Sequence, residues 1–242
     1  MPKLEAELVI ASKTTVLQVA VAPAVNTLNS LVLLSQGKKL SGLGDRINQI
    51  TSELDPQILE RHHVVAEGLF FALLPKRGCA SFEDHIDDLA TSDPVALRDK
   101  ILNAYLCKVP AEDRELYQRN DWETILHSED AFIEFMYDKF GTDHIDEEVE
   151  RSAYNLLIDP PAMQETILTH IRYMWQEYFS EEWERVLPTI EESVAAFKKV
   201  DLSSMSPTQA AHFITGKEPD EKFEELAHDL DEIVFVPSTH GG

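Results

Sequence analysis

The stretches of sequence that decide the fold lie at the two ends of the chain: EAELVI at residues 5–10, TVLQVAVA at residues 15–22 and IVFV at residues 233–236. In the first two, apolar residues recur at every second position, which is the spacing of a β-strand with one buried face. Residues 12–14 between them predict the turn of a hairpin. Because a strand needs a partner strand, we expect the two ends of the chain to meet in a small antiparallel sheet.

The long interval between these strands carries repeated signals for helices. Four capping side chains each stand directly before a proline, a residue that fits the first position of a helix because no N–H donor is needed there. These pairs are Asp55-Pro56, Asp93-Pro94, Asp159-Pro160 and Ser206-Pro207. We therefore predict helices at residues 23–35, 56–73, 82–90, 94–106, 111–117, 129–140, 143–157, 160–179, 180–197, 207–215 and 219–230, with a glycine-containing loop at residues 36–51.

The segment at residues 160–179 has the clearest helical pattern. Ser180 is expected to cap the helix that follows it, and Pro188 is expected to kink that second helix near Arg185, because proline removes one backbone hydrogen bond. In the first of the two helices, apolar residues repeat at steps of three and four and so share one face: Met163, Ile167, Ile171, Met174 and Tyr178.

Length and composition indicate a globular chain with a real core. The chain has 242 residues, of which 43% are hydrophobic, and this is enough apolar surface to close a core. No internal repeat, low-complexity tract or proline-rich linker divides it. We therefore predict a single domain over residues 1–242 of the mainly α (α+β) class, a multi-helix domain with a small antiparallel sheet formed from the chain termini.

Acidic residues dominate the charge of the chain. Asp and Glu number 44 against 21 Lys and Arg, for a formal net charge of -23. Such a surface repels phosphate groups, so direct nucleic-acid binding by these residues is unfavourable. The acids cluster at residues 121–150 and 218–232. These runs fit solvated helix faces, and they also offer a surface to a basic partner.

Motifs of catalysis and cofactor binding are absent from the sequence. No GxSxG, GxxxxGK[ST] or GxGxxG pattern occurs, and Cys79 and Cys107 have no metal-ligand spacing. We therefore expect neither an enzyme nor a bound cofactor or metal. No apolar stretch approaches the roughly 20 residues of a membrane helix, and the start of the chain lacks a secretory signal, so we expect a cytoplasmic protein.

One histidine pattern leaves a metal site open as an alternative. His63 and Glu67 are four residues apart on a predicted helix, with His62 beside them, and this spacing can place two ligands on one metal ion. No third ligand follows at helical spacing, and the pattern lacks the second histidine of the zinc proteases. Polar residues on the outside of an amphipathic helix explain it more simply.

Aromatic residues concentrate where the two predicted helices at residues 160–179 and 180–197 meet. Their rings fall on more than one face, whereas a stripe on one face would be core alone. Core packing remains one explanation; a ligand cavity or a dimer contact is another, because aromatic side chains are enriched in both. The candidate ligand-binding residues are Tyr173, Trp175 and Trp183.

Three segments together resemble the amino-terminal domain of bacterial ArsR-like transcription regulators, a poorly characterised helical domain that precedes a winged helix-turn-helix. They are ELVIASKTTVLQVAVAPAVNTLNSLVLL at residues 7–34, YMWQEYFSEEWERVLPTIEESV at residues 173–194 and DEIVFVPSTHGG at residues 231–242. The resemblance implies a homodimer that senses an effector and binds DNA through a downstream winged helix. The chain ends at Gly242 without a recognition helix, so we expect that domain outside this sequence.

Three hypotheses about function follow. The first is a regulatory domain of an ArsR-like regulator, for effector sensing, dimerisation or both, with a small-molecule effector and no membrane partner. The second is a free-standing acidic helical module that binds a basic protein through residues 121–150 or 218–232. The third is a metal-dependent helical enzyme that uses His62, His63 and neighbouring carboxylates.

Overall fold

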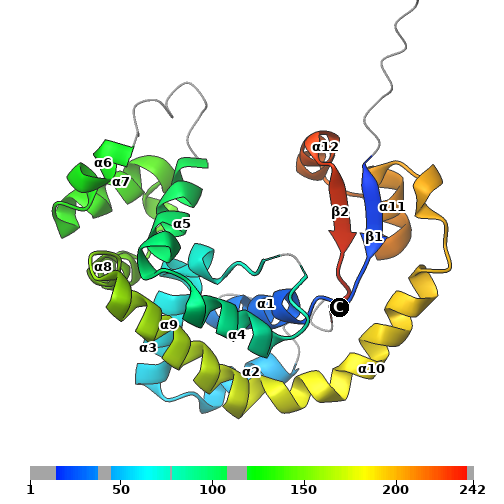
Figure 1. Ribbon diagram of the computed structural model, residues 1–242, viewed down its shortest axis with the longest axis horizontal. Helices are drawn as coiled ribbons and strands as arrows, with labels where there is room; N and C mark the ends of the chain where they lie inside the picture. Colours follow the sequence, from blue (N-terminus) through cyan, green and yellow to red (C-terminus); the bar gives the residue numbers. More distant parts are fainter. Residues whose placement is uncertain (1–14, 38–44, 77, 108–118, 239–242) are drawn as a thin grey trace, which may run out of the picture. The chain divides into compact units, whose positions relative to one another are not determined.

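The computed structural model describes residues 15–37, 45–76, 78–107 and 119–238, and they are mainly helical (Figure 1). They belong to two compact units. Of the described residues, the larger unit contains Ala22–Val186 and Ser238, and the smaller unit contains Thr15–Val21 and Leu187–Pro237. The predicted helical class is confirmed. The expectation of a single domain concerns how the two units sit together, and it stays a prediction.

The smaller unit contains a two-stranded sheet made from the two ends of the chain. Strand β1, Val16–Val19, pairs with β2, Glu232–Phe235, with Val16 opposite Glu232. The meeting of the ends is confirmed, but the strands are parallel, so the predicted antiparallel arrangement is wrong. Two adjacent strands joined by a tight turn must run antiparallel, whereas strands joined by a long crossover are free to run parallel. Here the chain between Val19 and Glu232 forms that crossover.

Helices complete the smaller unit. They are the later part of α10 (Ser180–Phe197), the 3₁₀ turn η6 (Leu202–Ser204), α11 (Pro207–Thr215) and α12 (Glu221–Asp229). Ser206 and Gln209 form a reciprocal capping box at the start of α11, and Gly216 ends that helix with a φ of 68°. This is the left-handed conformation that glycine adopts at little cost.

The larger unit contains only helical elements in its described part. They are α1 (Pro23–Ser35), α2 (Asp45–Glu53), α3 (Pro56–His63), the π-helical turn η1 (Val64–Gly68), the 3₁₀ turn η2 (Phe70–Leu73), α4 (Phe82–Thr91), α5 (Pro94–Cys107), α6 (Arg119–Ile125), α7 (Glu129–Phe140), the 3₁₀ turn η4 (Thr142–His144), α8 (Glu147–Leu157), α9 (Pro160–Met174), the π-helical turn η5 (Trp175–Phe179) and the start of α10.

Most predicted helices are confirmed, but α2 and α6 were not expected. Helix α2 lies where glycines and polar residues predicted a loop. Its two isoleucines, Ile47 and Ile50, are fully buried and Leu54 follows on the same face, so a short apolar stripe outweighed the loop composition. The predicted strand at residues 5–10 with its hairpin, and the predicted helix at residues 111–117, lie outside the described residues.

The predicted caps are present at the helix starts. Asp55 accepts a hydrogen bond from the Gln57 backbone N–H, and Asp159 accepts one from Ala162. Asp93 accepts one from Val95 at 2.7 Å. Each carboxylate satisfies a donor that the first turn leaves free, which is worth about 1 kcal/mol per helix.

The predicted cap at Ser180 is wrong. Its backbone is helical, with φ −60° and ψ −49°, and α9, η5 and α10 follow one another without an intervening loop. The π-helical turn of five residues carries the chain through the aromatic run, so no new helix start is needed there. Pro188 does lie inside α10, and the kink near Arg185 stays a prediction.

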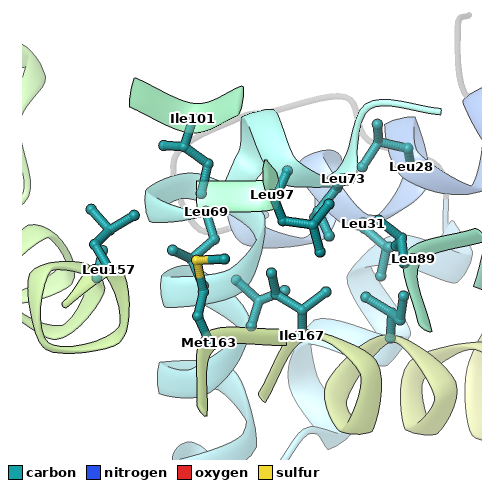
Figure 2. Close-up of a cluster of buried hydrophobic side chains, with 14 of the residues drawn as sticks. Leu28, Leu31, Leu69, Leu73, Leu89, Leu97, Ile101, Leu157, Met163 and Ile167 are labelled. Carbon is teal, nitrogen blue, oxygen red and sulfur yellow. The ribbon is translucent and has the colours of Figure 1, made fainter. Parts of the chain in front are cut away.

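The core of the larger unit draws apolar side chains from helices far apart in the sequence (Figure 2). Leu31 of α1, Ile101 of α5 and Ile167 of α9 are all almost fully buried. The predicted stripe of α9 supplies one wall of this core. Burying each such side chain stabilises the fold by about 1.5–3 kcal/mol, so helix packing holds this unit together. In the described part of the chain, none of the helices combines the length with the hydropathy of a membrane span.

Candidate functional site

The three aromatic residues expected to bind a ligand make different contacts in the structure, and their part in binding stays a prediction. Trp175 is buried, its ring centroid lies 5.0 Å from that of Phe82, and its Nε1–H donates to Glu83 at 2.8 Å. Tyr173 is half-buried, and its hydroxyl lies 3.4 Å from that of Tyr178. The two side chains therefore have separate partners, and core packing explains Trp175.

Trp183 lines a small cavity between α1 and the start of α10. Asn26, Thr27 and Ser30 form its polar side, and the cavity volume is about 20 Å³. One water molecule needs about 10–15 Å³ by the same measure. The cavity therefore has room for a water molecule but not for an organic effector.

Of the two histidines considered as metal ligands, His62 lies in the core, whereas His63 is half-buried and contacts Glu67. His62 is fully buried, with Nε2 at 2.8 Å from the Leu31 carbonyl oxygen and Nδ1 at 3.0 Å from Nε2 of His170. Both ring nitrogens of His62 are thus engaged. Among the described residues, no group of three His, Cys, Asp or Glu side chains could hold a metal ion. This geometry gives no support to the metal-dependent enzyme.

A larger hollow lies elsewhere in the larger unit, and we call it the acidic groove. Its volume is about 580 Å³. One part of its lining is apolar and aromatic, and the other part carries carboxylates. The described residues that line it are Gln36, Glu67, Phe71, Tyr105, Met136, Phe140, Ile145, Asp146, Val149 and Glu150.

Helix α8 brings two of the carboxylates to the groove. Asp146 caps the helix by accepting a hydrogen bond from the Val149 backbone N–H. Glu150 follows one turn later, beside the inward-facing Val149 and Ala153. Acidic residues in the first turn interact favourably with the helix dipole, so α8 tolerates several carboxylates at its N-terminus. The same turn places one of them, Glu150, on the buried side.

Glu150 is the unusual member of the groove. Its side chain is only 9% exposed, and its Oε2 finds no hydrogen-bond partner among the described residues. Burial, together with the nearby charges of Glu67 and Asp146, raises the pKa of Glu150 from 4.5 to about 7. A buried carboxylate without a partner costs free energy, so this side chain requires an explanation that packing does not supply.

The π-helical turn η1 brings Glu67 to the groove, and η1 packs directly against α8. A Cβ on Gly68 would lie 2.8 Å from Cβ of Ala153, so only glycine permits this close approach of η1 to α8. The Glu67 carboxylate lies 3.3 Å from Nδ1 of His63. A π-helical turn inserts an extra residue into a helix, and Glu67 lies within this one.

Three aromatic rings form the rest of the wall. Tyr105 of α5 makes near-perpendicular contacts with Phe71 and Phe140, with ring centroids 5.8 Å and 5.6 Å apart. The Tyr105 hydroxyl donates to the Gly68 carbonyl oxygen at 3.2 Å, which ties the ring to η1. Burial is the main cause that raises the pKa of Tyr105, with Glu150 adding to it. Tyr105 is therefore neutral, and the groove combines rigid rings with carboxylates.

The groove sets a carboxyl group that can exchange a proton near neutral pH beside two further carboxylates. The described lining contains no Ser, Thr, Cys, Lys, Arg or His. What the groove offers is negative charge beside apolar and aromatic surface.

Sequence reasoning missed the acidic groove because the acids were interpreted as solvated helix faces. A signal was present: Glu150 lies within the stripe that also carries Val149, Ala153 and Leu157. A carboxylate inside an apolar stripe is expected to be buried. The lining residues from η1, η2, α5 and α7 show no comparable sequence pattern, because only tertiary packing brings them to the acidic groove.

Comparison with protein-family models, curated proteins and solved structures found no match to this chain.

Proposed function

We propose that this chain is the effector-sensing regulatory domain of a transcription regulator of the ArsR-like type, and that the effector binds in the acidic groove. The observation that carries the proposal is Glu150 Oε2, a buried carboxylate oxygen with no hydrogen-bond partner among the described residues, beside a hollow of about 580 Å³. Pockets for small organic molecules commonly have volumes of about 300–1,000 Å³ and few polar groups. A ligand would supply the missing partner.

The groove is suited to sensing because several separate elements line it. Glu67 comes from η1, Tyr105 from α5, Phe140 from α7 and Glu150 from α8. A ligand that contacts all four residues favours the conformation in which their four elements lie closest together. Such differential binding is what a ligand needs to shift a conformational equilibrium. In this proposal the shift reaches DNA through a winged helix outside this sequence, in a cytoplasmic homodimer.

A thermal-shift screen tests the proposal. The panel contains small organic cations, anions and neutral compounds, and the proteins are the native chain and two variants. Ile145→Trp fills the groove, because Ile145 lines it and is half-buried. Ile158→Trp is the matched control, because Ile158 is 51% exposed at the other end of α8.

We expect some compounds to raise the melting temperature of the native chain and of Ile158→Trp but not that of Ile145→Trp. An equal shift in all three proteins would place binding elsewhere and contradict the proposal. The absence of any shift for every charge class would contradict it as well.

A second candidate function rests on the smaller unit. Leu226 and Leu230 of the α12 region and Phe213 of α11 are 63%, 45% and 48% exposed, and α12 also carries acidic residues in its first turn. Exposed apolar side chains amid carboxylates fit an interface for a basic protein. Binding through these charges would weaken steeply between about 0.1 M and about 1 M NaCl, where the screening length falls from about 10 Å to about 3 Å.

A further inference from the structure

We infer that the occupant of the acidic groove is an organic cation, a substituted ammonium group that carries apolar substituents. This inference rests on the proposed function, because it names the class of effector for the same site. Three features of the groove carry it: the sign of its charges, the nature of its apolar wall and the missing partner of Glu150.

The charges in the lining all have one sign. Glu67, Asp146 and Glu150 are the ionisable side chains of the described lining apart from Tyr105, and no Lys or Arg is among these residues. An anionic ligand would meet repulsion on every charged side. A neutral ligand would leave the buried carboxylate of Glu150 without compensation, whereas a cation supplies an opposite charge at short range.

The aromatic wall selects among cations. Phe71 and Phe140 are half-buried in the lining, and each contacts Tyr105 edge to face, at interplanar angles of 85° and 72°. Aromatic faces attract ammonium groups that have shed their water, and cages of this kind recognise quaternary ammonium. Met136 also belongs to the lining, and its thioether is polarizable.

A divalent metal ion fits this groove poorly. Calcium and magnesium require about six or more oxygen ligands, several of which are water for magnesium. The groove opposes its carboxylates with rings and aliphatic side chains, and no group of three metal-ligating side chains was found among the described residues. A weakly hydrated organic cation makes use of both halves of the groove, and a metal ion uses only one.

Isothermal titration with matched probes tests the inference. The cationic probe is benzyltrimethylammonium. Neopentylbenzene has the same shape without the charge, and phenylacetate carries the opposite charge. We expect binding of the cation, and binding of the neutral isostere at least about tenfold weaker, since a cation over a desolvated ring gains about 2 kcal/mol.

Variants of the lining locate the probe. Glu150→Gln removes the buried charge while keeping the shape, and we expect it to weaken binding of the cation by about thirtyfold or more. Glu148→Gln is the matched control, because Glu148 is an exposed carboxylate of the same helix turn outside this lining. Phe140→Leu is a second variant, expected to weaken the cation more than the neutral isostere, while Phe140→Tyr retains its binding.

The outcomes separate this inference from the proposed function. If phenylacetate or the neutral isostere binds in the groove more tightly than the cation, effector sensing stands and the cation inference is overturned. Equal binding of the cation to the native chain and to Glu150→Gln overturns it too. If no probe and no compound of the screening panel binds, both the inference and the proposed function fail.

Discussion

At the scale of single residues, Glu150 is a carboxyl group whose protonation is coupled to folding. Its pKa in the folded chain is about 7 against an ordinary 4.5. Between these values the folded state binds the proton more tightly than the unfolded state does. The Glu150 carboxyl group therefore makes its full contribution to the free energy of unfolding below pH 4.5, and this contribution is lost as the pH rises through 7.

We predict that Glu150→Gln stabilises the chain at high pH only. At pH 8 the native carboxylate is charged and buried, so the variant should raise the free energy of unfolding by about 2–3 kcal/mol. At pH 5 the native side chain is protonated and the two proteins should be alike. Urea denaturation at both pH values measures this, with Glu148→Gln as the exposed control. A destabilised Glu150→Gln protein at pH 8 would contradict the prediction.

The buried histidine pair should make the chain sensitive to acid. Burial lowers the pKa of His62 to about 4 and, together with the neighbouring His62, that of His170 to about 3. Below pH 6.5 the unfolded state therefore binds more protons than the folded state does. The contribution of the two histidines to the free energy of unfolding is full above pH 6.5 and is lost as the pH falls towards 4. At pH 5 the cost is about 2 kcal/mol for each histidine.

The measurement is best made in the Glu150→Gln variant, which removes the opposing titration of that carboxyl group. We expect its free energy of unfolding to fall between pH 7 and pH 5. Ring resonances of His62 and His170 in NMR spectra should stay at their neutral positions down to pH 5. Histidines that titrate near pH 6.5 in the folded protein would contradict this account of the core.

At the scale of elements, the contact between η1 and α8 builds one side of the acidic groove. Gly68 and Ala153 meet there, and a Cβ on Gly68 would lie 2.8 Å from that of Ala153. Alanine normally favours a helix over glycine by about 1 kcal/mol. Steric overlap should reverse that preference at this position, at a cost of about 1–3 kcal/mol.

We therefore predict that Gly68→Ala lowers the melting temperature, and that adding Ala153→Gly restores part of the loss by reopening the space. Ligand binding in the groove should weaken in Gly68→Ala as well, since Glu67 moves with η1. Thermal unfolding of the two single variants and the double variant forms a mutant cycle. Additive effects would show that the two residues do not contact each other.

The helix caps allow a second prediction at this scale. Asp159 accepts a hydrogen bond from the Ala162 backbone N–H at the start of α9. Asp159→Ala should lower the free energy of unfolding by about 1 kcal/mol, whereas Asp159→Asn should retain most of the stabilisation that the cap provides. Urea denaturation distinguishes the two. An equal loss in both variants would indicate that charge, and not the cap, matters there.

At the scale of the whole molecule, net charge is the dominant property. A formal charge of -23 on 242 residues opposes compaction through self-repulsion. Raising NaCl from about 0.01 M to about 1 M shortens the screening length from about 30 Å to about 3 Å. We predict that the melting temperature rises over this range, and equally in KCl. A fall would mean that attractive ion pairs, such as those of Arg151 with Glu129 and Glu147, outweigh the repulsion.

The sequence by itself determined the mainly helical class, most helix boundaries and the meeting of the chain ends. These depend on local signals: capping residues before prolines, apolar stripes such as that of α9, and period-two strands. It could not determine the direction of the strand pairing, because the same two strands satisfy either direction and the crossover between them decides it. Helix α2 was missed where a three-residue stripe competed with glycines.

Only the tertiary structure decided the acidic groove. Glu67, Tyr105 and Glu150 come from three elements, and no spacing in the sequence relates them. The burial of Glu150 could be suspected from its place in the stripe of α8, but its missing partner could not. Burial and hydrogen bonding depend on what packs against a side chain, and this is set by the arrangement of helices after their local structure has formed.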